Sequence, residues 1–237
     1  MRNYIVFDGI STEHYATYLS GAGIFEVPKR EITKQSIQGR NGDLIFDSEK
    51  YGNIPAFFPI IIMDDFLKNK NELASIFSQK VGYKRLENSF EPEYYRFAHF
   101  DGMTDISSKT YMDSGKLYLR FDCKPQKFLK TGEQPISVAV NSTVEVKNPT
   151  FQTALPLIIV TGTGTFNINN EPYTLSVNTG TVYVDCELRE VYEGNINRNN
   201  DFTRYELKMP SLKSGINTIS CGAGISIKVI PRWFEIS

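Results

Sequence analysis

The sequence predicts a mainly β protein, with an α+β N-terminal domain that contains one helix and a C-terminal antiparallel β-sandwich. Three observations predict this fold class. Apolar and polar residues alternate along much of the chain, as in strands with one buried face. One segment has the apolar spacing of a helix. The density of charged residues also falls along the chain. Residues 1–130 hold 18 Lys+Arg and 17 Asp+Glu, whereas residues 131–237 hold 8 Lys+Arg and 10 Asp+Glu.

The change in charge falls at the segment KPQKFLKTGEQP, residues 124–135. Its prolines, glycine and lysines are typical of a boundary between domains. We therefore expect two domains, residues 1–130 and residues 131–237. The composition, 41% hydrophobic and 13% aromatic, is that of a globular chain with ample material for two cores.

The N-terminal domain is expected to pack its helix on a sheet. The helix is predicted in DDFLKNKNELASIFSQKVG, where Asp64 or Asp65 can accept hydrogen bonds from the first backbone N–H groups and Gly82 follows the end. Its apolar face would hold Phe66, Leu73, Ile76 and Phe77. The segment KLYLRFDC alternates as a strand, with the buried side formed by Leu117, Leu119, Phe121 and Cys123.

The stretch IQGRNGDL, residues 37–44, lies between two apolar runs. It leads into another short strand and not into a helix, at whose entrance a backbone cradle for an anion would be expected. Asn41-Gly42 is suited to a tight hairpin turn because both residues tolerate positive φ. Arg40 and Asp43 would then project as a charge pair at the tip, where either contact with a neighbouring subunit or plain solvation is compatible with the sequence.

The C-terminal domain is predicted to consist of short strands with Gly, Asn and Pro turns, which favours a sandwich. A hairpin is expected in TFNINNEPYTLSV, with a turn at residues 169–172. Three further strands each place alternate residues on one buried face. These are Ile136, Val138 and Val140; Val182, Val184, Cys186 and Leu188; and Ile225, Ile227, Val229 and Trp233.

Bulk charge excludes several classes of partner. The net charge is −1, which gives no excess of Lys and Arg for nucleic acid or an anionic membrane. No signal peptide and no apolar run long enough to cross a bilayer is visible, so we expect a soluble protein made in a cytoplasm.

Catalytic and metal-binding patterns are missing from the sequence. His14 and His99 are far apart, which argues against a histidine metal site. Cys123, Cys186 and Cys221 are isolated, and the first two lie on the apolar side of their strands, as buried cysteines do. The chain lacks a G-x-S-x-G turn and a Walker lysine, and its GTGTF and GAGIS segments are better explained as strand-end turns. We therefore predict no catalytic residue, no cofactor and no metal.

Carboxylates leave one enzymatic alternative open, because a glycosidase needs two of them facing each other across a sugar. Asp185 and Glu187 share the outward side of a predicted strand, where solvated charges are normal. Aromatic residues leave a second alternative, since an exposed ring can stack on a sugar. The candidates for sugar stacking are Tyr173, Tyr183, Tyr192 and Trp233, against the commoner use of such rings in a core or an interface.

An ordered series of segments resembles the Dit family, the distal tail proteins of phages with long, flexible, non-contractile tails. The N-terminal segments are PKR at residue 28, GRNGDL at residue 39 and YGN at residue 51. The C-terminal ones are residues 148–175, residues 183–200 and the ending SGINTISCGAGISIKVIPRWF. Family members often end their last strand with Pro-Arg-Trp-Trp, and here Phe234 replaces the second Trp.

The resemblance implies a structural virion protein without enzymatic activity. Members of the family form a six-fold ring at the tail tip, with a galectin-like C-terminal sandwich on the outside. This implies as partners further copies of the chain, the tail tube protein, the tape measure protein, the tail-associated lysin or fibre protein, and in many phages receptor-binding proteins for host adsorption. Arg40, Asn41, Gly42 and Asp43 are then candidates for the contact with a subunit or the tube, and the location is the tail tip of the virion, after assembly in the host cytoplasm. The alternative function is a carbohydrate-binding module that recognises cell-surface polysaccharide through its C-terminal sandwich.

Overall fold

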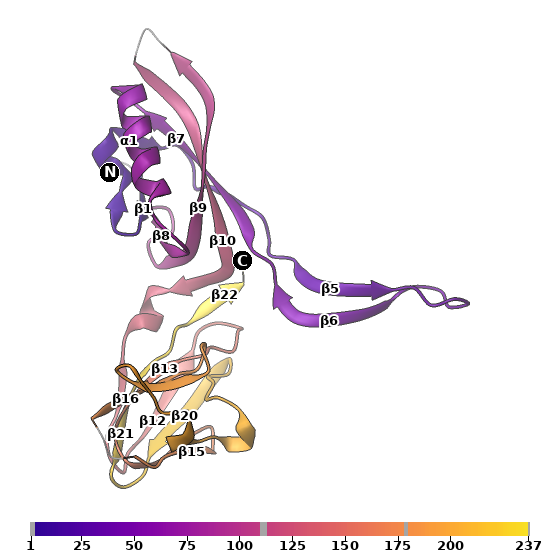
Figure 1. Ribbon diagram of the computed structural model, residues 1–237, viewed down its shortest axis with the longest axis vertical. Helices are drawn as coiled ribbons and strands as arrows, with labels where there is room; N and C mark the ends of the chain where they lie inside the picture. Colours follow the sequence, from indigo (N-terminus) through magenta and orange to yellow (C-terminus); the bar gives the residue numbers. More distant parts are fainter. Residues whose placement is uncertain (1–2, 110–112, 178–179, 237) are drawn as a thin grey trace. The chain divides into compact units, whose positions relative to one another are not determined.

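The computed structural model describes residues 3–109, 113–177 and 180–236. The chain folds into two compact units, Met1–Lys127 with Ile236–Ser237, and Phe128–Glu235. Each unit is built on antiparallel sheets (Figure 1), so the mainly β fold class is confirmed. The expected domains, residues 1–130 and residues 131–237, stay a prediction. Among the described residues, no helix has the length and apolar character needed to cross a membrane.

The first unit is an antiparallel sheet with helix α1 (Phe66–Ser78) packed against it. The strands run in the order β2-β1-β8-β9-β10-β7-β3, and β4 pairs with β7. Their bounds are β1 (Ile5–Phe7), β2 (Ile10–Ser11), β3 (Thr17–Leu19), β4 (Ile24–Phe25), β7 (Ile54–Ile62), β8 (Lys84–Asn88), β9 (Tyr94–Lys109) and β10 (Ser114–Leu129). Strands β5 (Arg30–Gln35) and β6 (Leu44–Tyr51) form a separate two-stranded sheet.

Aromatic rings fill the core of the first unit. Phe121 of β10 lies 5.1 Å from Phe7 and 5.5 Å from Phe100, measured between ring centroids, and both contacts are edge-on. Phe77 of α1 closes the cluster at 5.1 Å from Phe7. The predicted inward side of β10 is confirmed: Leu117, Leu119, Phe121 and Cys123 are each at most 1% exposed.

Helix α1 buries the face that its apolar spacing predicts, with Phe66, Leu73 and Phe77 in the core. Its N-terminus differs from the prediction. Asp65 occupies the N-cap position with φ 44°, but its carboxylate makes no capping hydrogen bond. Instead the carboxylate of Asp64 accepts a bond from the Asp65 N–H at 3.0 Å. The expectation that one of the two aspartates caps the first turn through its side chain is therefore wrong.

The second unit is a sandwich of two antiparallel sheets. One sheet has the order β11-β21-β13-β16-β17-β18, and the other has the order β12-β20-β14-β15-β19. The bounds of the first sheet are β11 (Ile136–Val138), β21 (Ile225–Ile230), β13 (Leu157–Gly162), β16 (Thr181–Asp185), β17 (Glu190–Glu193) and β18 (Ile196–Asn197). Those of the second are β12 (Thr143–Asn148), β20 (Gly215–Cys221), β14 (Gly164–Ile168), β15 (Glu171–Leu175) and β19 (Phe202–Thr203), and β22 (Phe234–Ile236) follows at the end of the chain.

Alternate residues of both sheets meet in one core between them. The predicted hairpin is present as β14–β15, and its turn is shorter than predicted. Only Asn169 and Asn170 connect the strands, with φ 53° and 67°, which is the pair of positive angles that a two-residue hairpin turn requires. Glu171 and Pro172, expected in the turn, already pair as strand residues.

The GTGTF and GAGIS segments are strand-end turns that lie against each other. The Thr163 N–H donates to the Gly224 carbonyl at 3.1 Å, and the Gly222 N–H donates to the Thr165 carbonyl at 2.9 Å. Gly162 has φ 89°, and a Cβ there would lie 2.1 Å from the Gly224 oxygen. These glycines therefore allow two backbones to approach closely, and the prediction that they serve the fold is supported by this contact.

Two predicted inward residues are wrong. Val140 is 47% exposed because β11 ends two residues earlier, at Val138. Leu188 is 64% exposed because β16 ends at Asp185, whose carboxylate accepts the backbone N–H groups of Glu187 and Leu188, both at 3.1 Å. The remaining members of the three predicted strand faces are at least partly buried, among them Val182, Val184, Ile225 and Val229.

Candidate functional site: the β5–β6 hairpin

The β5–β6 hairpin is the least buried part of the first unit. All six residues of β5 are exposed, and so are the six central residues of β6. The two strands pair with each other and, within the described chain, with no third strand. Each strand therefore presents a free edge of backbone N–H and C=O groups, which is a template for pairing with another chain.

At the base of the hairpin the pairing of β5 with β6 is irregular, and local contacts fix this irregular register. Arg30 pairs with Tyr51, but Ile32 already pairs with Asp47, so β6 carries extra residues at this point. Glu49 absorbs the bulge with φ 58°, and the Ser48 hydroxyl donates to the Glu31 carbonyl at 2.6 Å. Bulges of this kind bend and twist a strand and fix its direction.

An exposed ion pair also joins the two strands at the base. Arg30 Nε lies 2.5 Å from Asp47 Oδ2. Hydrogen bonds from Arg30 and from the Glu49 N–H hold the pKa of Asp47 below its usual value. Because both side chains are well exposed, water and salt screen the pair, and its effect is to set geometry rather than stability.

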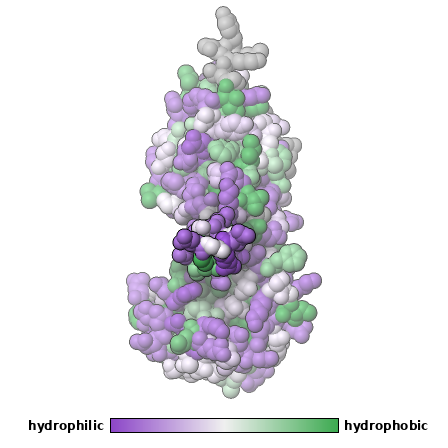
Figure 2. Space-filling view, turned by 90° about the vertical axis from the view of Figure 1, so that its right-hand side faces the viewer, coloured by the Kyte–Doolittle hydropathy of each residue, from purple (hydrophilic) through white to green (hydrophobic). Residues whose placement is uncertain are grey.

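The tip is an eight-residue loop, residues 36–43, rather than a two-residue Asn-Gly turn. The Arg40 N–H donates to the Ile37 carbonyl at 3.2 Å, and the positive φ angles belong to Gly39 and Gly42, at 80° and 81°. Asn41 is not among the residues with positive φ, so the predicted Asn41-Gly42 turn is wrong in detail. Figure 2 faces this tip and shows mainly hydrophilic residues there.

The four candidate residues Arg40, Asn41, Gly42 and Asp43 are all exposed in this loop. In residues 3–109, which include the whole hairpin, no ion pair joins Arg40 to Asp43. The expected charge pair at the tip is therefore absent, and the ion pair of the hairpin lies at its base. Both tip charges are consequently available to a partner.

Apolar side chains line both faces of the hairpin, and sequence reasoning missed them. Ile45 is 58% exposed, Phe46 52% and Ile32 44%. The register puts Ile32 and Ile45 on one face, and Leu44 and Phe46 on the other. The consecutive apolar run Leu44–Phe46 was a usable signal, because such a run occurs in strands that are covered on both faces. The chain covers neither face fully.

The histidines and cysteines considered as catalytic or metal-binding residues are either exposed and far apart in the chain or buried. His14 and His99 are both exposed and lie in different elements, η1 (Thr12–Tyr15) and β9. Cys123, Cys186 and Cys221 are buried free thiols, as predicted for the first two. Burial raises the pKa of the Cys123 thiol to about 12, so this thiol is a poor nucleophile.

Asp185 corrects the prediction of a solvated carboxylate. It lies on the outward side of β16 but is only 4% exposed, because Arg232 covers it. Arg232 Nη1 and Nη2 each donate to a different Asp185 oxygen at 2.9 Å. Burial alone would raise the pKa of Asp185, but Arg232 and two backbone N–H groups hold it below its usual value. The group is thus an ionised structural partner of Arg232 at neutral pH, unsuited to proton transfer.

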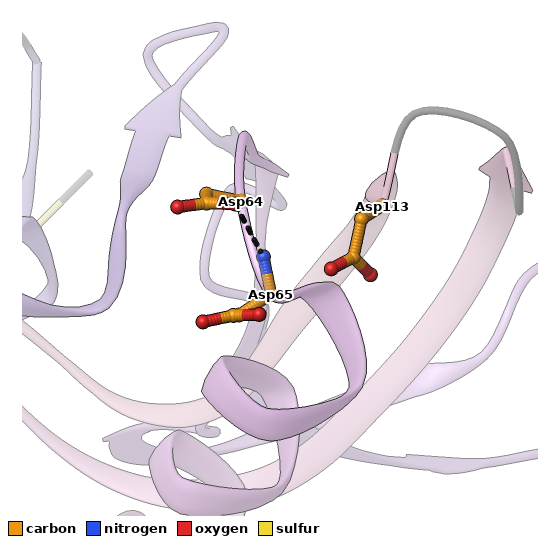
Figure 3. Close-up of side chains that lie close together, drawn as sticks. All are labelled: Asp64, Asp65 and Asp113. Atoms are coloured by element: carbon orange, nitrogen blue, oxygen red, sulfur yellow. Dashed lines mark hydrogen bonds between the residues drawn. The ribbon is translucent and has the colours of Figure 1, made fainter.

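Three other carboxylates gather in the first unit. Asp64, Asp65 and Asp113 place one oxygen each within 4.8 Å of one another, and all three are exposed (Figure 3). Asp64 and Asp65 precede α1, and Asp113 precedes β10. Exposed acidic groups often gather in this way without binding a metal, and among the described residues nothing else near them indicates a ligand. The absence of a metal site stays a prediction.

The four candidate sugar-stacking rings divide into two pairs. Tyr173 is fully buried and stacks on Phe166 at 5.6 Å and on Phe202 at 6.1 Å, and Trp233 is 5% exposed. These two rings belong to the core and offer no free face, so their proposed role in stacking on a sugar is wrong. Tyr183 and Tyr192 are half-buried on the outer face of the first sheet of the sandwich and stack on each other at 5.4 Å.

A shallow hollow of about 460 Å³ lies on the same outer face. Strand register aligns Ser137, Lys228, Ile159, Tyr183 and Tyr192 in one row across five strands. The first four of these residues line the hollow, together with Thr161, Thr181 and Ser226. The surface therefore combines several hydroxyl groups, the ammonium group of Lys228 and the aromatic ring of Tyr183.

Comparison with known proteins adds a likeness in fold. No protein-family model matches the sequence, and no curated protein matches it. The structure is similar to the SPP1 Dit (gp 19.1) protein, described as a paradigm of the hub adsorption apparatus in phages that infect Gram-positive bacteria. The match has a TM-score of 0.74 at 16% identity and covers 97% of this chain and 98% of that one.

A chain of the phage P2 baseplate in its activated conformation with Ca also aligns over 97% of both chains, with a TM-score of 0.48 and 8% identity. That likeness is too weak to carry an argument. The likeness to the SPP1 protein confirms the expected resemblance at the level of the fold, over nearly the whole of both chains.

Proposed function

We propose that this chain is a structural protein of the distal tip of a non-contractile phage tail, where it forms a ring of identical subunits. The observation that carries the proposal is the full-length likeness to the SPP1 Dit protein, which includes both units and not a single common domain. A shared fold alone does not establish function, so the second support must come from this chain itself. That support is the β5–β6 hairpin.

The hairpin has the properties of a contact between subunits. A two-stranded ribbon is at best marginally stable by itself in water, and this one exposes apolar side chains on both faces. Burying Ile45 and Phe46 on a neighbouring chain would contribute about 2 kcal/mol for each side chain. Contacts that run from one surface to a different surface of the next copy close into rings when the rotation permits.

The remaining partners are those that the resemblance to the Dit family implies. We propose six subunits, the tail tube and tape measure proteins on one side, and the tail-associated lysin or fibre protein on the other, with receptor-binding proteins around them. Arg40, Asn41, Gly42 and Asp43 would contact the next subunit or the tube. Such a ring would serve host adsorption as a connector, with no enzymatic activity of its own.

Light scattering on the purified chain across a concentration series, together with negative-stain microscopy, tests this proposal. Six chains of 26.9 kDa have a mass of about 161 kDa, and a species of that mass with ring-shaped particles is the expected result. A chain that stays at 26.9 kDa at every concentration, alone and when mixed with tails that lack it, would contradict the proposal. Zymography on bacterial cell walls is expected to show no clearing, and clearing would favour a glycosidase instead.

Sugar binding is a second candidate function, which the row across the sandwich favours. Tyr183 offers a ring beside Ile159, and Lys228 and several hydroxyl groups offer hydrogen bonds to a polyhydroxylated ligand. A glycan array probed with the full-length chain tests it. Binding that Tyr183→Ala removes, and that the control Tyr205→Ala outside the row leaves intact, would support the candidate. An array without signal would reject it.

A further inference from the structure

Three loops of the sandwich meet around a second hollow, with a volume of about 400 Å³. The loops are the connections from β12 to β13, from β16 to β17 and from β19 to β20. Its lining includes three cationic side chains and three apolar ones: Arg189, Arg204 and Lys208, with Leu155, Leu207 and Met209. None of these residues belongs to the hairpin or to the row across the sandwich.

The positive charge at this hollow is largely uncompensated. Among the hydrogen bonds and ion pairs of the described residues, none involves Arg189 or Arg204, whereas Lys208 is paired with Glu206 at 2.7 Å. Other arginines of the same unit behave differently: Arg198 binds Glu193 at 2.8 Å and Arg232 binds Asp185. The net charge of the whole chain is −1, so two unpaired guanidinium groups at one hollow create a local excess of positive charge.

Apolar side chains surround these charges. Leu207 is 87% exposed and Leu155 is 37% exposed, and Leu188, next to Arg189, is 64% exposed. Leu207 and the preceding Glu206 both adopt left-handed backbone angles, with φ 61° and 45°, and Arg189 has φ 59°. Such angles are unfavourable for residues other than glycine and concentrate where a structure serves a ligand or partner.

We propose that this hollow binds an acidic segment of a partner protein, with carboxylates on Arg189 and Arg204 and an apolar side chain against Leu155, Leu207 and Met209. Guanidinium groups bind carboxylates in a bidentate geometry, which gives both charge and direction. The exposed leucines indicate a ligand with apolar side chains, which a free phosphate or a simple sugar acid lacks. A chain of net charge −1 does not offer the extended basic surface that nucleic acid requires.

Selection from a random peptide library on the immobilised full-length chain tests the proposal without assuming a sequence. A parallel selection uses the variant Arg189→Ala/Arg204→Ala. Peptides enriched on the native chain alone are expected to contain Asp or Glu together with Leu, Ile or Phe. Enrichment without an acidic bias, or equal enrichment on the variant, would overturn the proposal.

Fluorescence anisotropy with the most enriched peptide then measures affinity. Arg189→Ala/Arg204→Ala is expected to weaken binding at least tenfold and Leu207→Ser severalfold, whereas the control Lys68→Ala/Lys147→Ala, with the same change in charge at exposed positions, leaves it unchanged. Circular dichroism verifies that the variants fold. Equal weakening by the control pair would reduce the effect to net charge, and displacement by inorganic phosphate at millimolar concentration would indicate a plain anion site. Either result rejects the acidic segment, and neither depends on whether the chain forms a ring.

Discussion

Two hairpins of this chain, β14–β15 and β5–β6, both carry apolar residues on their strands but have opposite surroundings. In β14–β15, Phe166, Ile168, Tyr173 and Leu175 alternate into the core and are at most 1% exposed. In β5–β6 the strands are longer, yet Ile32, Ile45 and Phe46 are 44–58% exposed. The β14–β15 hairpin packs against the other sheet of the sandwich, whereas the β5–β6 hairpin has no covering layer within the described residues.

The contrast teaches that a hairpin can be well defined locally and still lack the burial that makes strands stable. The Asn169-Asn170 turn and the Glu49 bulge each fix a register. Only the β14–β15 hairpin then gains stability from removing apolar surface from water. An exposed hairpin with apolar faces is therefore interpreted as an interface that another chain completes.

The largest expected effect comes from truncating the buried hairpin. Tyr173→Ala removes a ring that stacks on Phe166 and Phe202, and we expect the free energy of unfolding to fall by about 3–5 kcal/mol, as for other large-to-small core changes. Urea denaturation measures it. The matched change Phe46→Ala on the exposed hairpin is expected to cost less than about 0.5 kcal/mol in the monomer. Equal losses of unfolding free energy in Tyr173→Ala and Phe46→Ala would contradict the contrast between the two hairpins.

The ion pair of the exposed hairpin and the buried ion pair of the sandwich should differ in the same direction. Arg232→Met leaves Asp185 buried without its partner, and we expect a loss of about 3 kcal/mol at neutral pH. Arg30→Met at the exposed pair is expected to leave the unfolding midpoint unchanged. Thermal unfolding of both variants distinguishes the two pairs, and an equal shift would show that burial is not what separates them.

The buried pair also predicts a pH dependence. The folded-state pKa of Asp185 is lowered, so its contribution is present above the unfolded-state value of about 3.9 and is lost as pH falls through the folded-state value. The native chain should therefore lose stability in acid more steeply than Arg232→Met does, as measured by denaturant midpoints between about pH 2 and pH 6. If the denaturant midpoints of the two chains changed with pH in parallel, Arg232 would not be the group that lowers the pKa of Asp185.

Substitution of the exposed apolar residues of the β5–β6 hairpin is expected to have the smallest effect on stability and the largest effect on assembly. Ile45→Ser/Phe46→Ser should change the monomer's free energy of unfolding by less than about 0.5 kcal/mol per site, because both side chains are already exposed. The same variant should remove the high-mass species in light scattering. Val81→Ser, at an 85% exposed position elsewhere in the first unit, is the control and should assemble normally. Assembly by the double variant would exclude these side chains from the contact.

The sequence predicts the strands best where tertiary structure agrees with local periodicity. Alternation located the buried sides of β10, β16 and β21, because one face of each packs on a core. It failed at strand ends: Val140 and Leu188 continue the pattern after the strand has stopped. Periodicity reports which side of a strand is apolar, and carries no information about where hydrogen bonding to the neighbouring strand ends.

Contacts between distant residues explain the other errors. Asp185 was correctly placed on the outward side of its strand, but Arg232, 47 residues later, covers it. At the tip, local sequence could not decide which of Gly39, Asn41 and Gly42 takes positive φ. The tip residues 40–43 were identified as a candidate contact, while Ile45 and Phe46 were missed because apolar strand residues are usually buried by their own chain. Alternation had already placed Trp233 on a buried face, whereas Tyr173 could not be told from a surface ring without knowing which sheet face it occupies.

Amide hydrogen exchange across residues 30–51 tests the central claim most directly. In the isolated chain, these amides should exchange within seconds to minutes, while those of β7 and β10 exchange far more slowly. In the assembled species the same hairpin amides should become protected, because a neighbouring chain covers the strands. Hairpin amides that are protected as strongly as β10 in the isolated chain, or that stay fast in the assembly, would contradict the account.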